Sequence, residues 1–301
     1  MQKAEWPSLP YTDWAETCET IHAWTQIIGK VKMALSVPEN HWWHVALQVT
    51  PRGISSGTIP FESRTFQIDL DLVSHELRII TSDAKIEIVK LEAKTVKVFY
   101  AEFLEAMARA GISMKIDTLP KEVKDPIRFD EDTVHASYDR KSVEKFRNIL
   151  VSCDRTLREF RAKFCGQTSP VHFFWGSFDL ALSRFSGKTA PQKSEGGKTT
   201  QVSQDFSVGF WPGSPSYPKP AFYAYALPPP EAYYDSIISP KQARFDAKLG
   251  EFILDYDDLI LLDDPKQAIL EFAESTYVAA ADLGNWDRDQ LECLVLEHIP
   301  G

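Results

Sequence analysis

The apolar residues of this chain change their spacing twice in the same order, and this change constrains the fold more than any other feature. Helical spacing over residues 12–29 gives way to alternation between residues 45 and 91, and helical spacing returns over residues 96–111. The second part of the chain, from residue 139 to residue 284, repeats this order. A period of 3.6 residues is typical of amphipathic helices and a period of two of half-buried strands. We therefore expect an α+β protein with antiparallel sheets covered by helices.

The repeated order predicts two pseudo-symmetric helix-strands-helix halves, residues 1–125 and 126–301, packed as one compact unit. A length of 301 residues is sufficient for two units of ordinary domain size. His44 begins a predicted strand in the first half and His172 begins one in the second. If the halves are duplicates, a pseudo-two-fold axis relates these two strands.

Capping residues predict where several helices begin and end. Asp139 and Asp264 precede two helical stretches, and aspartate at this position accepts hydrogen bonds from the first turn. Pro265 fits the first helical position because its fixed backbone angle suits a helix start. Gly29 and Gly111 stand where two apolar stripes stop, and glycine commonly ends a helix.

Two strands and one loop are predicted in the second half. Alternating and aromatic residues predict strands around Val171–Phe185 and Phe252–Ile260. Residues 188–204 are polar and contain glycine, so they are predicted to form a mobile surface loop.

Charge and cysteine usage exclude several classes of protein. The formal net charge of -10 disfavours a general nucleic-acid binder, because phosphate backbones attract clustered lysine and arginine. No window reaches the roughly 18 apolar residues of a membrane span, and the N-terminus lacks the apolar core of a signal peptide. We therefore expect a cytoplasmic protein with neither a membrane nor a nucleic-acid partner. The cysteines lack a C-x-x-C spacing and are predicted to be reduced, structural thiols: Cys18, Cys153, Cys165 and Cys293.

The segment from Ser169 to Pro191 sets His172, Asp179, Arg184 and Ser186 among phenylalanine and tryptophan residues. A polar group buried without a partner costs on the order of 2–7 kcal/mol, so these groups must satisfy one another or face a ligand. On a regular strand His172 and Asp179 point to opposite faces, and a one-residue bulge at Gly176 would bring them to the same face. The pair then allows general-base chemistry. The alternative is a structural core network.

No metal or cofactor motif is recognisable in the chain. His41 and His44 are three residues apart, but this spacing chelates a metal from a helix and not from a strand, so no metal site is predicted. Common hydrolase, metalloprotease and nucleotide-binding motifs are also absent from the sequence. The sequence therefore predicts no particular cofactor and no oligomeric state.

Several sequence blocks carry a resemblance that covers nearly the whole chain. They are His41-Trp-Trp-His-Val45, Pro170-Val-His-Phe-Phe-Trp-Gly-Ser-Phe-Asp-Leu-Ala181, Arg184-Phe-Ser-Gly187, Gly209-Phe-Trp-Pro-Gly213, Phe222-Tyr-Ala-Tyr-Ala226 and Trp286-Asp-Arg288. In these blocks the chain resembles an uncharacterised bacterial family, domain of unknown function 5996. The resemblance implies a bacterial, cytoplasmic protein and implies no activity, cofactor or catalytic residue.

Three functional hypotheses follow. The first is a small-molecule binding protein, anionic ligands included, with a pocket between the halves. The second is a hydrolase or transferase in which His172 is the general base and Asp179 orients it. The third is an interaction scaffold without a pocket. The ligand-binding candidates are Arg184, Ser186, Trp175, Phe178, Trp211, Tyr223 and His44.

Overall fold

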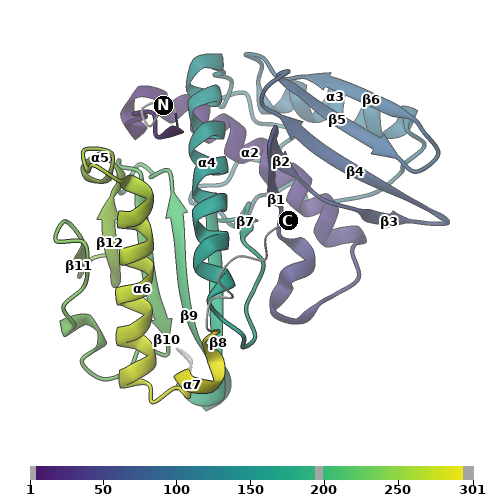
Figure 1. Cartoon of the computed structure of the whole chain (residues 1–301). Helices are drawn as coiled ribbons and strands as arrows, with labels where there is room; N and C mark the ends of the chain where they lie inside the picture. The colour runs from purple at the N-terminus through teal and green to yellow at the C-terminus, as the bar shows by residue number, and fades with distance from the viewer. Residues whose placement is uncertain (1–4, 194–198, 294–301) are drawn as a thin grey trace, which may run out of the picture. The chain divides into compact units, whose positions relative to one another are not determined.

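The computed structural model describes residues 5–193 and 199–293 (Figure 1). The chain forms two compact units. Unit 1 contains the chain up to Ser152 together with His172–Asp179 and Gly213–Pro218, and unit 2 contains the remainder. Both units combine antiparallel strands with helices, which confirms the predicted α+β class. The division at residue 125 and the pseudo-symmetry of the halves stay predictions.

Unit 1 is built on an antiparallel sheet with the strand order β1-β2-β4-β5-β6, and β3 pairs with β4. Phe66, Ile68 and Leu70 of β4 are buried, as their alternation predicts. Helix α3 packs on the sheet at β6, and its Phe99 and Phe103 are fully buried. The elements of unit 1 are α2 (Tyr11–Leu35), η1 (Asn40–Val45), β1 (Gln48–Thr50), β2 (Gly53–Ser55), β3 (Ile59–Phe61), β4 (Arg64–Asp71), β5 (Glu76–Thr81), β6 (Ile86–Lys90), α3 (Val96–Arg109), the first part of α4 (Arg140–Ala162) and β7 (His172–Phe174).

Helix α2 does not end at Gly29, contrary to the prediction, and continues to Leu35. A glycine inside a helix costs roughly 1 kcal/mol relative to alanine, so a tertiary reason must retain it. A Cβ atom at Gly29 would lie 2.1 Å from Cδ2 of Trp175, so the missing side chain makes room for the indole ring. Beyond Gly29, Lys32 donates from Nζ to the carbonyl oxygens of Ala46 at 2.6 Å and of Ser56 at 2.5 Å.

Unit 2 is built on a longer antiparallel sheet that includes the strand order β11-β12-β10-β9-β8. Helix α6 packs on β9 and β10, and Figure 1 shows it lying along this sheet. Asp264 caps α6 by accepting a hydrogen bond from the backbone N–H of Gln267, as predicted. The elements of unit 2 are the remainder of α4, β8 (Asp179–Lys193), β9 (Thr199–Trp211), β10 (Ala221–Leu227), η2 (Tyr233–Asp235), β11 (Arg244–Asp246), β12 (Glu251–Asp255), α5 (Tyr256–Leu259), α6 (Pro265–Leu283) and α7 (Arg288–Leu291).

Three predicted segments differ from the structure. The strand predicted around Val171–Phe185 is interrupted by a turn over residues 175–178. The strand predicted at Phe252–Ile260 ends at Asp255, and α5 follows. The polar residues 188–204 are largely strand, because β8 and β9 continue through them and pair up to Lys193 and Thr199. Residues 194–198 lie outside the described residues.

Two of the four cysteines form a disulfide, which corrects the prediction of reduced thiols. Cys165 and Cys293 are bonded, whereas Cys18 and Cys153 are buried free thiols. The two bonded residues are separated by 128 positions in the chain, so spacing alone gave no indication of the pairing. Within the described residues, no helix has the length and apolarity to cross a membrane.

Candidate functional site

The turn after β7 changes the geometry predicted for His172 and Asp179. The chain reverses between them, with Phe178 in the left-handed region at φ 59°, so a bulge at Gly176 is not what positions the two residues. Asp179 accepts a hydrogen bond from the hydroxyl of Ser177. The His172 ring is buried and packs edge-on against Trp43 and Phe174, with ring centroids 6.2 and 5.8 Å apart. A catalytic pairing of His172 with Asp179 stays a prediction.

Trp175 and Phe178, two predicted pocket walls, lie in the core of unit 1. Trp175 donates from its indole nitrogen to the carbonyl oxygen of Val45 at 2.9 Å. The Phe178 ring stacks on His22 and Phe146 and meets Phe173 edge-on. Both side chains are at most 4% exposed, so their contacts are those of core packing.

His44 lies in η1, which replaces the strand approach predicted for this segment. His41 and Trp42 both adopt left-handed backbone angles, φ 55° and 60°. This conformation pairs the ring of His41 with that of Trp43 and stacks the ring of Trp42 on that of His44. His44 Nδ1 accepts a hydrogen bond from the backbone N–H of Glu39 at 3.1 Å. Among the described residues, no group of three or more His, Cys, Asp or Glu side chains is arranged to hold a metal ion.

His22 belongs to a polar network beneath the turn that contains Trp175. Gln26 donates from Nε2 to the carbonyl oxygen of Trp175 at 2.8 Å, and the same nitrogen lies 2.9 Å from His22 Nε2. Burial lowers the pKa of His22 to about 4. The ring is therefore neutral at neutral pH and becomes charged only in acid.

Acidification from about pH 7.5 to about pH 4.5 is expected to reduce the free energy of unfolding of the wild type by about 2 kcal/mol more than that of His22→Gln. The pKa of histidine is about 6.5 in an unfolded chain and about 4 here, so falling pH protonates the unfolded state first. Urea titrations of both proteins at both pH values measure this. The comparison isolates His22 from Asp205, whose pKa burial raises to about 6 and which acts in the opposite direction. Equal losses in the two proteins would contradict the prediction.

Arg184 lies in the core of unit 2 and is 1% exposed. Its guanidinium carbon is 3.5 Å from the ring centroid of Phe160, 4.3 Å from that of Tyr277 and 5.0 Å from that of Phe164. One guanidinium nitrogen donates to the carbonyl oxygen of Phe160. Desolvation lowers the pKa of Arg184 to about 10, so the side chain is still charged at neutral pH. These contacts join the sheet to α4 and α6 within unit 2.

Trp211 and Tyr223 lie on the opposite face of the same sheet from Arg184. Tyr223 pairs with Gly209 across β9 and β10, and directly opposed residues share a face. A Cβ atom at Gly209 would lie 2.5 Å from the hydroxyl oxygen of Tyr223, so the phenol ring crosses the sheet in the space that glycine leaves. Trp211 lies two residues further along and faces the same way.

A cavity of about 260 Å³ lies within unit 2, where the start of β9 and the end of β10 meet the end of α6. Most of its lining residues are apolar, although polar and apolar atoms contribute nearly equally to its surface, and none of the predicted site residues lines it. The lining residues are Gln204, Asp205, Ala226, Leu227, Pro228, Pro229, Pro230, Glu231, Ala280, Leu283, Gly284 and Trp286. Ser186, a predicted ligand-binding residue, is one contact away, because its hydroxyl donates to Gln204 Oε1 at 3.1 Å.

The alternation of side chains along β9 determines which polar side chains point towards the cavity. Gln204 has the parity of the buried Phe206, whose ring contacts Tyr277 of α6, so its amide lies on the helix-covered face. Asp205 has the opposite parity, and its carboxylate accepts a hydrogen bond from the hydroxyl of Ser207 on the other face at 3.4 Å. Asp205 therefore borders the cavity mainly through its backbone.

A model of the family of unknown function DUF5996 matches residues 6–293. The chain belongs to this family. The matched residues span most of both units and include all the sequence blocks on which the resemblance rests. Searches of curated proteins and of solved structures gave no match. The bacterial origin suggested by the resemblance stays a prediction.

Sequence reasoning missed the residues that line the cavity of this DUF5996 member. The polar composition of residues 188–204 predicts a loop that ends at Gln204, whereas Gln204 lies in β9. Trp286 follows α6 and is 9% exposed. The one signal that could have found Trp286 is its place in the Trp286-Asp-Arg288 block, because a tryptophan just beyond a glycine-capped helix must pack on a neighbouring element.

Proposed function

We propose that unit 2 binds a small, largely apolar molecule that carries an uncharged hydrogen-bond acceptor, and that the cavity beside the end of α6 is its site. The observation that carries the proposal is the cavity volume of about 260 Å³, lined mostly by apolar residues with a few polar ones among them. An apolar cavity of about 150 Å³ already accommodates benzene, and ligand pockets commonly begin at about 300 Å³. The volume therefore suits a ligand little larger than one substituted ring.

Two donors support the choice of an acceptor-bearing ligand. Gln204 has its amide oxygen occupied by Ser186, and its NH₂ group makes no hydrogen bond to the described residues. The indole N–H of Trp286 likewise has no partner among them. A pocket usually holds a few such polar groups among apolar walls, and these groups orient the ligand.

The charges around the cavity favour an uncharged ligand over the anionic one predicted from Arg184. The lining residues include the acidic Asp205 and Glu231 and no lysine, arginine or histidine. Helix α6 ends at Leu283 with Gly284 as its C-cap, both in the cavity wall, and the C-terminal end of a helix dipole is negative. Arg184 is enclosed by aromatic rings at the sheet face. The proposal therefore keeps a small-molecule ligand but replaces the anionic ligand with an uncharged one.

Acetophenone is expected to bind more tightly than benzene, which lacks a hydrogen-bond acceptor, and than benzoate, which is anionic. Gln204→Leu keeps the side-chain volume and removes the donor. It is expected to weaken acetophenone binding by about tenfold, equivalent to the roughly 0.5–1.5 kcal/mol of one hydrogen bond, and to leave benzene binding unchanged. Isothermal titration calorimetry measures the dissociation constants of the tighter complexes, and ligand-observed NMR measures those of the weak complexes.

Leu283→Trp is the control that addresses the cavity itself. Leu283 lines the cavity and is 43% exposed, so a larger side chain can be placed there with little risk to folding. This variant is expected to abolish binding of every member of the series. Binding that survives Leu283→Trp places the ligand elsewhere, and absence of binding to the wild type favours the scaffold hypothesis. Neither the scaffold nor the His172 enzyme hypothesis gains a specific observation of its own.

A further inference from the structure

The residues from Gly284 to Cys293 form a strap that supplies one wall of the cavity. At its near end, Trp286 packs on Gly284, where a Cβ atom would lie 2.8 Å from the indole nitrogen. The Trp286 ring also meets the ring of Tyr277, with centroids 5.9 Å apart, and its backbone N–H donates to the carbonyl oxygen of Ala281 at 2.8 Å. Trp286 is therefore seated by contacts with α6.

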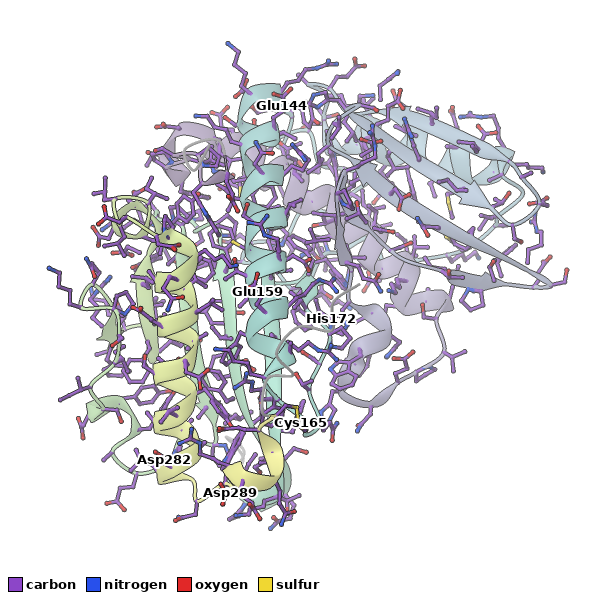
Figure 2. All side chains as sticks on the ribbon, in the orientation of Figure 1. Glu144, Glu159, Cys165, His172, Asp282 and Asp289 are labelled. Atoms are coloured by element: carbon purple, nitrogen blue, oxygen red, sulfur yellow. A yellow bond between two sulfur atoms is a disulfide. The ribbon has the colours of Figure 1, made fainter. Side chains whose placement is uncertain are left out.

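The far end of the strap is fastened to the segment that follows α4. Cys293 is bonded to Cys165, and Figure 2 shows Cys165 beside α7, with Asp289 on that helix. The backbone N–H of Cys165 donates to the carbonyl oxygen of Leu291 at 2.7 Å. The backbone N–H of Cys293 donates to the carbonyl oxygen of Lys163 at 3.0 Å. The disulfide is the one covalent bond among these contacts.

Arg288 links the two ends of the strap. It donates from Nε to Glu292 at 2.5 Å and from Nη1 to Asp282, at the end of α6, at 3.0 Å. Both ion pairs are accessible to solvent, and such pairs contribute little by themselves. The far end is held by the disulfide together with backbone hydrogen bonds, so a displacement there is transmitted through α7 towards Trp286 once the covalent bond is broken.

We propose that the Cys165–Cys293 disulfide controls ligand access to the cavity, so that the oxidised protein binds and the reduced protein releases the ligand. This regulation rests on the proposed function of the cavity. The reductant is a dithiol, either a small molecule or a protein. One thiolate attacks Cys165 Sγ, and Cys293 leaves as a thiolate. The second thiol then displaces Cys165, so the two cysteines gain two electrons and two protons and the dithiol becomes a disulfide.

The exposure of the cysteines suits such an exchange. Cys165 is exposed and Cys293 is half-buried, whereas the free thiols of Cys18 and Cys153 are buried. Exposed disulfides are the ones that redox partners reach, and buried thiols are inert. A dithiol therefore reduces the Cys165–Cys293 disulfide and leaves the buried thiols of Cys18 and Cys153 unchanged.

The test compares wild-type protein with and without dithiothreitol, using acetophenone as the probe and hydrogen exchange of residues 284–293 as a second readout. Reduction is expected to weaken acetophenone binding by about tenfold, within the range of about 5- to 150-fold typical of coupled sites. It is also expected to accelerate exchange in the strap. Cys165→Ser should reproduce the reduced protein in both readouts, and dithiothreitol should not change it further.

The outcomes separate this proposal from the one on which it rests. Faster strap exchange with weaker probe binding supports redox control. Equal binding by oxidised and reduced protein overturns it and leaves the cavity function standing, whatever the exchange shows. Unchanged exchange on reduction also overturns it. Absence of acetophenone binding to the oxidised protein overturns both proposals.

Discussion

Arg184→Ala is expected to lower the free energy of unfolding by about 2–5 kcal/mol, the range for truncation of a large buried side chain. Arg184 is 1% exposed, and its guanidinium contacts the rings of Phe160, Tyr277 and Phe164. Truncation leaves a void among three aromatic rings and deprives the carbonyl of Phe160 of a donor. Urea titration followed by circular dichroism measures the loss.

The matched variant Arg184→Met separates packing from charge. In the described residues no carboxylate lies within ion-pairing distance of Arg184, and its Nε has no hydrogen-bond partner. A buried charge without a counter-ion is costly, and an apolar side chain of similar volume is often neutral or stabilising in its place. The free energy of unfolding of Arg184→Met is therefore expected to lie within about 1 kcal/mol of the wild-type value or to exceed that value.

The result also tests the ligand-binding role predicted for Arg184. A side chain that recognises an anion can be removed at little cost to stability, because it has no structural contacts to lose. If Arg184→Ala and Arg184→Met both have the wild-type free energy of unfolding, Arg184 does not stabilise the core of unit 2. A large loss in the alanine variant alone shows that the packing of the Arg184 side chain among the rings, and not its charge, stabilises unit 2.

Gly29→Ala is expected to destabilise unit 1 by about 3 kcal/mol, at the upper end of ordinary overpacking. Intrinsic helix propensity predicts the opposite sign, because alanine is favoured over glycine inside a helix by roughly 1 kcal/mol. The new Cβ atom would lie 2.1 Å from the Trp175 ring. The ring cannot withdraw freely, since its indole nitrogen donates to the carbonyl of Val45. Either the helix or the ring must therefore shift.

A double-mutant cycle with Trp175→Leu tests this cause. In the Trp175→Leu background the space beside Gly29 is larger, so Gly29→Ala should become neutral or slightly stabilising, as propensity alone predicts. Chemical denaturation of the four proteins gives the coupling energy. The same penalty in both backgrounds would show that contact with Trp175 is not what excludes a side chain at position 29.

Local chemistry explains why some elements were predictable and others were not. Asp139 accepts a hydrogen bond from the backbone N–H of Ser142, and Asp264 and Pro265 begin α6, so these helix starts depend on neighbours in the sequence. Gly29 has the same local character as a helix-ending glycine, but a residue nearly 150 positions away decides its role. Sequence patterns carry no information on such contacts.

The candidate site was less predictable than the fold for the same reason. The aromatic context of Arg184 and Ser186 predicts ligand-binding residues, yet the structure gives Arg184 a cage of three rings and places Ser186 against Gln204. The cavity itself joins the start of β9, the end of β10 and the end of α6. No single segment contains it, so no motif could reveal it.

The sequence by itself determined the α+β class, most helix and strand positions, and membership of the DUF5996 family. The fold class and the element positions follow from apolar periodicity and capping residues, and the family membership follows from short sequence blocks. All three signals depend on residues that are close together in the sequence. Only the tertiary structure decided that Cys165 pairs with Cys293, that Gly29 makes room for Trp175, and that Gln204 and Trp286 border one cavity. Each of these depends on packing between segments distant in the chain, where shape and burial decide which contacts form.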